Sequence, residues 1–185
     1  MMLDKFTEKA QAALSEAQEA AFLGTHPEVN PWHLLSALIE QTDGLIPPLF
    51  QRMGIDPARV REVVEAQLAS MPTQSGGQAL PSNEFQSVIR SAVGEAKAMQ
   101  DQFVSTEHLL LAMLRDRRSA VGEYLHSIGV GRERVLNALK ELRGGEAVLD
   151  QNPEGKLQAL ERFTVDLTSR ARAGKVDPVI GRDDE

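Results

Sequence analysis

The sequence predicts an all-α protein: two four-helix repeats packed about a pseudo-twofold axis, followed by a linker and one helix. The first indication is that VNPWHLLSAL, beginning at Val29, recurs as VSTEHLLLAM from Val104, an offset of 75 residues. The second is that apolar residues recur at intervals of three and four. The third is that no segment alternates apolar and polar residues, so no strand is expected within or between the repeats.

The repetition continues beyond these ten residues. At the same offset of 75, Gly54 matches Gly129 and Arg59 matches Arg134. A chance match would decay outside the first window, so the chain contains an internal duplication. A repeat of about 65 residues has little core of its own, so the two repeats are expected to bury their apolar faces against each other.

Four helices are expected in the first repeat. The first carries apolar residues at helical spacing from Phe6 and ends near Gly24. The second begins after Asn30, which can cap free amides, with a proline in the first turn where its missing N–H costs nothing. The third covers about 45–53 and ends at a glycine. The fourth begins after Asp56, where the cap and proline recur.

Four more helices are expected in the second repeat, over residues 83–100, 105–116, 119–128 and 132–143. The Pro-, Gly- and Ser-rich segment 72–81 is a loop that separates the repeats. A shift of 79 places Phe85 on Phe6 and Ile89 on Ala10. This predicts four extra residues in the first repeat, in the loop near 24–28.

Three segments are therefore expected. Residues 1–143 form the double-repeat domain. Residues 144–156 contain several Gly, Asn and Pro residues and form a flexible linker. Residues 157–185 begin a further, truncated module, with an amphipathic helix that ends at Gly174 and continues into an extended DPVIG.

The composition excludes several classes of protein. With 42% hydrophobic and 25% charged residues among 185, the chain is typical of a soluble globular protein. A net charge of −7, with scattered cations, argues against nucleic-acid binding. The longest apolar run, residues 109–114, is too short to cross a membrane. The absence of cysteine excludes disulfides and thiolate metal sites and fits a cytoplasmic location.

The candidates for catalysis or metal binding are few. His33 and His108 occupy matching positions in a first helical turn, but neither has a second ligand four residues away. A local structural role is favoured for both over a metal site, and His26 and His126 are expected on the surface. The chain contains no GxSxG, GxGxxG or Walker A motif, so this segment is not expected to be an enzyme or to hold a metal.

The double repeat resembles the Clp N-terminal repeat domain. KELRGGEAV and LQALERFTVDLTSRARAGKVDPVIGRDDE are similar to the junction into the first AAA+ module of the ClpB family of disaggregase chaperones. The resemblance implies a cytoplasmic, stress-response ATPase that forms a homohexamer and threads aggregated polypeptide through its pore with the DnaK chaperone system. ATP and Mg are implied for the full-length protein and no cofactor for this segment, which is expected to be a monomer.

The resemblance also implies roles for particular residues. The residues matched to polypeptide binding are Thr7, Ser82, Val88, Ile89, Asp101 and Glu107. Those matched to the adenine pocket of the full-length protein are Val179, Ile180 and Gly181. Structural roles stand beside the first set: Ser82 caps a helix, Thr7 lies in a first turn and Glu107 is an acid near a helix start.

Two functions are compatible with the resemblance. In the first, a shallow apolar groove near the pseudo-twofold axis captures exposed apolar segments of unfolded or aggregated proteins and delivers them to the pore. In the second, a folded adaptor docks on the domain of a protease-coupled Clp ATPase of the ClpC or ClpA type. A histidine-dependent hydrolase is a third interpretation and would require stoichiometric metal.

Overall fold

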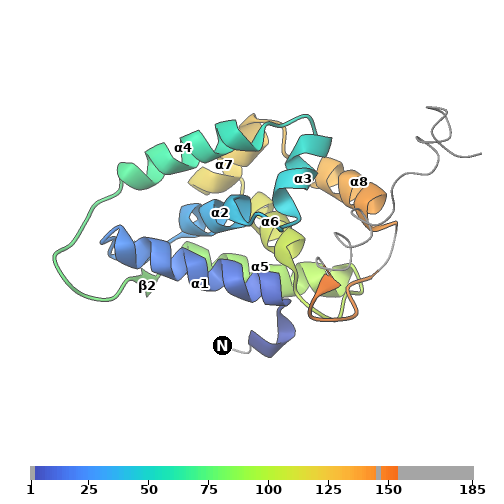
Figure 1. The fold of residues 1–185 in the computed structure, drawn as a ribbon, viewed down its shortest axis with the longest axis horizontal. Helices are drawn as coiled ribbons and strands as arrows, with labels where there is room; N and C mark the ends of the chain where they lie inside the picture. The colour runs from blue at the N-terminus through green and yellow to red at the C-terminus, as the bar shows by residue number, and fades with distance from the viewer. Residues whose placement is uncertain (1–2, 145–146, 154–185) are drawn as a thin grey trace, which may run out of the picture.

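The computed structural model describes residues 3–144 and 147–153 (Figure 1). Its helices are η1 (Leu3–Lys5), α1 (Glu8–Leu23), α2 (Pro31–Glu40), α3 (Ile46–Arg52), α4 (Pro57–Ala69), α5 (Asn83–Ala98), α6 (Thr106–Arg115), α7 (Ala120–Ser127) and α8 (Arg132–Arg143). The predicted helical class and the two sets of four helices are confirmed. The helix predicted after residue 157 lies outside the described residues. None of the described helices is long and apolar enough to cross a bilayer.

One offset of 75 relates the two repeats throughout, so the predicted four-residue insertion is wrong. Helices α1 and α5 both have 16 residues. Their N-caps are Thr7 and Ser82, whose hydroxyls each accept a hydrogen bond from the amide three residues later. Four residues make about one helical turn, so a slip of four keeps the same face buried and periodicity alone cannot detect it. The caps fix the register, in which Phe85 matches Ala10.

Two short strands correct the expectation that the chain has none. Strand β1 (Glu28–Val29) pairs in parallel with β2 (Leu80–Pro81). An isolated bridge joins Phe6 to Val104. An offset of 75 carries the two residues of the bridge onto β2 and β1, so both pairings are one contact repeated by the pseudo-twofold axis. Each pairing links the two repeats, and a strand of two residues is too short to give an alternating sequence pattern.

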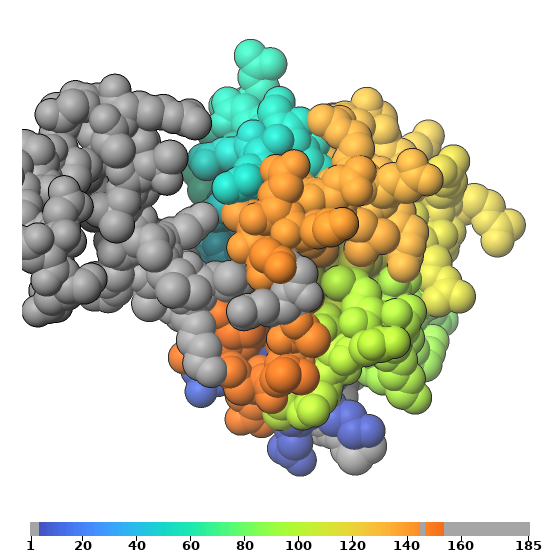
Figure 2. Space-filling view, turned by 90° about the vertical axis from the view of Figure 1, so that its right-hand side faces the viewer, coloured from blue at the N-terminus to red at the C-terminus, as the bar shows by residue number. Residues whose placement is uncertain are grey.

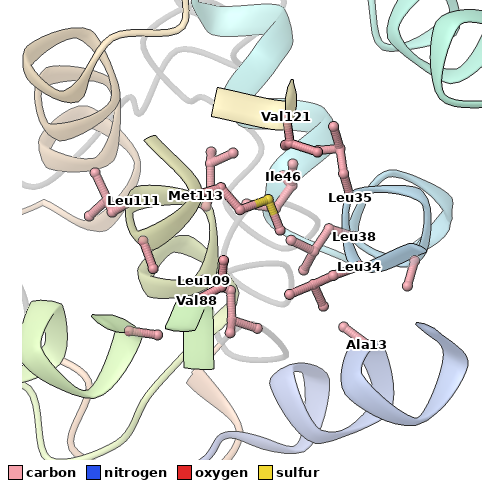
Figure 3. Packing of buried hydrophobic residues seen from close by; sticks show 14 of the residues in the cluster. Ala13, Leu34, Leu35, Leu38, Ile46, Val88, Leu109, Leu111, Met113 and Val121 are labelled. Carbon is pink, nitrogen blue, oxygen red and sulfur yellow. The ribbon is translucent and has the colours of Figure 1, made fainter. Parts of the chain in front are cut away.

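The two repeats share one core. Figure 1 shows α2 and α6 at the centre, with α1 and α5 beneath them. Figure 3 shows Met113 of α6 reaching toward Leu38 and Ile46 of the first repeat. The largest fully buried side chains come from both repeats: Leu34, Leu35, Leu38, Ile46, Leu49, Phe50, Phe85, Leu109, Leu110, Leu111, Met113 and Leu125. The expectation that the repeats bury their apolar faces against each other is confirmed.

Helix α8 makes a further connection between the repeats. It packs beside α3 of the first repeat, as Figure 2 shows. Arg134 on α8 donates to the Met53 carbonyl at 2.6 Å and to the Gly129 carbonyl at 2.8 Å. Because both carbonyls lie just after helices α3 and α7, this arginine binds helix ends that lack intrahelical partners.

Candidate functional site

Each repeat holds a buried histidine in the first turn of its second helix. His33 Nδ1 accepts a hydrogen bond of 3.1 Å from the Asn30 amide. His108 Nδ1 accepts one of 2.9 Å from the Ser105 amide. Both histidines therefore complete a capping box with the N-cap residue. Because Nδ1 is the acceptor, the proton of the neutral ring lies on Nε2. The structural role expected for these histidines is confirmed.

The Nε2 atoms face different partners in the two repeats. His33 Nε2 donates to His26 Nδ1 at 2.8 Å. His108 Nε2 donates to Asp101 Oδ2, also at 2.8 Å. His26 and Asp101 are 75 residues apart, so the same position carries a base in one repeat and an acid in the other. The prediction that His26 lies on the surface is wrong, because its ring packs against His33 and is 8% exposed.

The buried histidine pair predicts that stability falls in mild acid. Burial is the main cause that lowers the pKa of His33 from 6.5 to about 4, and the neighbouring His26 is the second cause. A proton then binds the unfolded chain more tightly than the folded one. The contribution of neutral His33 to the free energy of unfolding is full above pH 6.5. It is lost as the pH falls toward 4, by up to about 1.4 kcal/mol per pH unit. Urea denaturation at a series of pH values between 7 and 4 checks this.

Two variants isolate the contribution of His33. His33→Gln retains a residue that can complete the capping box and removes the titrating group, so stability should depend less on pH in this window. His126→Gln is the control, because the His126 ring is only half-buried and bonds to the Leu114 carbonyl at 3.0 Å. The assignment of this pH dependence to His33 is wrong if the stability of His33→Gln depends on pH as strongly as that of the unmodified protein.

In the second repeat, a buried charged cluster lies beside His108, the residue that matches His33. Arg143, the last residue of α8, donates to Asp101 Oδ2 at 3.1 Å and to Ser105 Oγ at 3.3 Å. Its guanidinium also forms an ion pair with Glu107. The side chains of Asp101 and Glu107 are each 1% exposed, so their charges depend on these partners instead of on water.

The same cluster holds the chain after it leaves α8. The Val148 amide donates to Asp101 Oδ1 at 2.7 Å, and the Val148 side chain is 2% exposed. The Gln151 carbonyl accepts from the Glu8 amide at 2.8 Å. We call residues 147–151 the exit segment. The sequence assigned it to a flexible linker, whereas in the structure it lies against the domain near the first residues (Figure 2).

The electrostatics of Asp101 favour its charged form. Burial by itself raises the pKa of this carboxyl. Hydrogen bonds from His108, the Val148 amide and Arg143 outweigh burial, so the net shift of the pKa is downward. The carboxylate is therefore charged at neutral pH and pairs with Arg143. Its contribution to stability is lost only as the pH falls below the ordinary range of an aspartate.

An open groove lies on the second repeat, between α5 and α6 and the turn that precedes α7. Its volume is about 300 Å³. Its apolar residues include Val88, Ala112 and Met113, which are 8%, 3% and 1% exposed. The polar side chains that line it include Glu84, Ser87 and Ser91 of α5. Arg115, the last residue of α6, and Asp116 and Arg118, which follow it, also line the groove. The groove therefore combines an apolar floor with a charged rim.

A second apolar surface lies at the end of α1. Phe22 and Leu23 are 61% and 71% exposed and border a hollow of about 360 Å³. The other side of the hollow is formed by the loop at Gln74, Gly76 and Gly77. The sequence analysis missed this surface. The sequence pattern that could have revealed it is the pair Phe22 and Leu23, two large apolar residues that lie next to the buried stripe of α1 but outside it.

The structure separates the residues that the resemblance assigned to polypeptide binding. Val88 lines the groove. Ile89 is 9% exposed and belongs to the core, and at the corrected register it matches Leu14. Ser82 is half-buried and caps α5, as expected. The predicted contacts of Val179 and its two successors lie outside the described residues.

The side chains of Thr7, Asp101 and Glu107 are buried and have structural partners. Thr7 is the N-cap of α1 and not a first-turn residue, and its amide donates to the Val104 carbonyl at 2.9 Å. Asp101 and Glu107 belong to the Arg143 cluster. These three residues do not line the groove. Asp101 instead lines a separate hollow of about 310 Å³, together with Leu139 and Arg143.

Comparison with known proteins identifies the fold. The sequence pattern of the Clp repeat (R) N-terminal domain matches residues 5–128, which include helices α1 to α7 and the groove. The chain belongs to the Clp repeat N-terminal domain family. Within the described residues of this Clp repeat domain, no group of three or more histidine or acidic residues could hold a metal ion.

Relatives of this Clp repeat domain are much longer proteins. The chain is 43% identical over 187 residues to "Chaperone protein ClpB" of Pseudomonas putida and 39% identical over 184 residues to that of Rhodopirellula baltica. The matches cover 100% and 99% of this chain. They cover only 22% and 21% of the relatives, so the chain spans about a fifth of their length.

Solved structures share the Clp repeat fold. The Hsp104 N-terminal domain from Candida albicans matches with a TM-score of 0.71 and 22% identity, over 81% of this chain and 99% of that one. A complex of the ClpV N-domain with a VipB peptide matches with a TM-score of 0.59 and 17% identity, over 78% and 91%. At these identities the similarity supports the fold alone.

Proposed function

We propose that this Clp repeat domain captures exposed apolar segments of unfolded or aggregated proteins for a ClpB-type disaggregase. The observation that carries the proposal is the open groove between α5 and α6, which has Val88, Ala112 and Met113 at its floor. An extended chain can place an apolar side chain against the floor at Val88, which is 8% exposed, and leave its backbone at the polar rim. The name of the relatives, and the peptide complex of a ClpV N-domain with the same fold, support this function.

Capture by this groove should be weak and reversible. At about 25 cal/mol per Å² of buried apolar area, a groove of this size yields little free energy after association costs are subtracted. Weak capture suits a domain that must release its polypeptide to a pore. In the proposed homohexamer, six such domains on one ring strengthen binding through their effective concentration.

The remaining activities belong to the proposed full-length protein. These are ATP hydrolysis with Mg, threading through the pore, cooperation with the DnaK system, and a role in the cytoplasmic stress response. The likeness of the whole chain to ClpB chaperones supports them. In this proposal the described domain supplies the first contact with the polypeptide and takes no part in the chemistry.

Docking of a folded adaptor is the alternative function, and one observation favours it. Phe22 and Leu23 form an exposed apolar surface at the end of α1, separate from the lining of the groove. An adaptor could bury both side chains without entering the groove. The alternative predicts that Phe22→Ser abolishes partner binding, whereas capture in the groove predicts little effect.

We expect Ser91→Trp to weaken binding of an unfolded polypeptide at least about tenfold, because the indole would fill the groove. Ser91 is half-buried and lines the groove. The measurement is a fluorescence anisotropy titration of the chain with a permanently unfolded, labelled protein. The native form of that protein should bind far more weakly, because its apolar residues are buried.

Gln86→Trp is the control for this experiment. Gln86 is exposed on the same helix and does not line the groove. Equal losses of affinity in Ser91→Trp and Gln86→Trp would show that binding does not use the groove. Equal affinity for the native and unfolded forms would contradict capture of unfolded chains altogether.

A further inference from the structure

The residues that line the groove of the second repeat differ from the matching residues of the first repeat. In the first repeat, Gln41 is 7% exposed, and its side chain bridges from the end of α2 to the Lys9 carbonyl at 2.8 Å. The matching residue of the second repeat is Asp116. Its carboxylate accepts from the Arg118 amide at 3.0 Å, within its own turn. Asp116 therefore does not bridge α6 to α5 as Gln41 bridges α2 to α1, and an open groove lies here in the second repeat.

The charge at the end of the second helix is also reversed. Glu40 and Asp43 of the first repeat correspond to Arg115 and Arg118 of the second. Both arginines are exposed and line the groove. Neither guanidinium is paired with a carboxylate of the described residues. On a chain of net charge −7, the open groove therefore carries two unpaired cations at the end formed by α6.

We propose that the groove selects polypeptide segments in which an apolar side chain lies next to carboxylates. This inference rests on the proposed function and names its substrate class. The apolar side chain occupies the floor at Val88, and the carboxylates bind Arg115 and Arg118. Guanidinium groups bind carboxylates through two parallel hydrogen bonds, so they distinguish acidic from neutral neighbours.

The other charges of the rim set the orientation of the segment. Glu84 lines the groove from the first turn of α5, and Asp116 is already bonded to the amide of its own turn. The segment therefore directs its carboxylates toward the end of α6 and away from Glu84. Segments that are rich in lysine bring cations toward Arg115 and Arg118 and are disfavoured.

Three labelled, unstructured peptides of equal length test this selection. They share the same apolar residues and differ only in their flanking residues, which are Glu, Gln or Lys. We expect the Glu peptide to bind about three- to tenfold more tightly than the Lys peptide at low ionic strength, because each exposed ion pair contributes little. The difference should shrink as salt is added.

A pair of variants locates the effect in the groove. Arg118→Asp should reduce the ratio of Glu-peptide to Lys-peptide affinity by at least about threefold. Arg117→Asp makes the same change of charge at an exposed neighbour that does not line the groove, and should change the ratio much less. Circular dichroism checks that both variants remain folded.

The outcomes separate this inference from the proposed function. The selection is wrong if the three peptides bind equally, or if Arg117→Asp acts as strongly as Arg118→Asp. If in that case the Gln peptide still binds and Ser91→Trp abolishes its binding, capture by the groove stands and only the selection fails. If none of the three peptides binds, the proposed function and the selection fail together.

Discussion

Replacing Arg143 with alanine is expected to lower the free energy of unfolding by about 3–5 kcal/mol. The guanidinium is the cation that bonds to Asp101 and is ion-paired with Glu107, and both carboxylates are buried. Without it, two negative charges stay in a region that excludes water. Guanidinium chloride denaturation of the variant and of the unmodified chain measures the loss.

Arg52→Ala is the matched control for Arg143→Ala. The Arg52 guanidinium pairs with Glu141 at 3.1 Å, but the two side chains are 45% and 68% exposed. A pair in water contributes about 0–1 kcal/mol, so its loss should be small. Similar losses in the two variants would contradict the role of the buried cluster. Faster hydrogen exchange of the Val148 amide in Arg143→Ala would show that the exit segment depends on the cluster as well.

Leu34→Ala and Leu109→Ala are each expected to lower the free energy of unfolding by about 2–5 kcal/mol. These leucines occupy matching positions in α2 and α6, and both have 0% exposure. Because the repeats share one core, a cavity in either repeat should destabilise both. Each variant should therefore unfold in a single transition at a lower temperature.

The single tryptophan makes this cooperativity measurable. Trp32 lies in the first repeat, and its ring centroid is 5.5 Å from that of Tyr124 in the second. In Leu109→Ala, thermal unfolding followed by Trp32 fluorescence should coincide with the loss of helical circular dichroism. A fluorescence transition at a clearly higher temperature would mean that the first repeat survives alone, and the shared core would not be the source of stability.

The sequence predicts the helices well because their caps and periods are local. Asn30 and Asp56 cap the helices that the sequence assigned to them. The register of α1 against α5 could not be found from periodicity, because a shift of one turn leaves the buried stripe in place. The paired strands were missed because two residues carry no pattern. Their pairing depends on the pseudo-twofold contact between repeats, which is a property of the assembled fold.

The sites were less predictable because they combine residues that are distant in the sequence. The resemblance named Val88, which lines the groove. The burial of Asp101 depends on Arg143 and Val148, which are 42 and 47 residues away, and no local pattern connects them. The cations at Arg115 and Arg118 became informative only after the fold placed them at the rim of a groove whose counterpart in the other repeat is bridged by Gln41.

The exit segment has a mechanical consequence. The Gln151 side chain donates to the Asp4 carbonyl at 3.2 Å, and the Gln151 carbonyl accepts from the Glu8 amide. The exit segment is therefore attached to the same end of the domain as η1 and the start of α1. Traction on the following residues therefore reaches η1 and the start of α1 first. A fluorophore meant to report tilting of the domain belongs on α4, which lies on the opposite side from η1 in Figure 1.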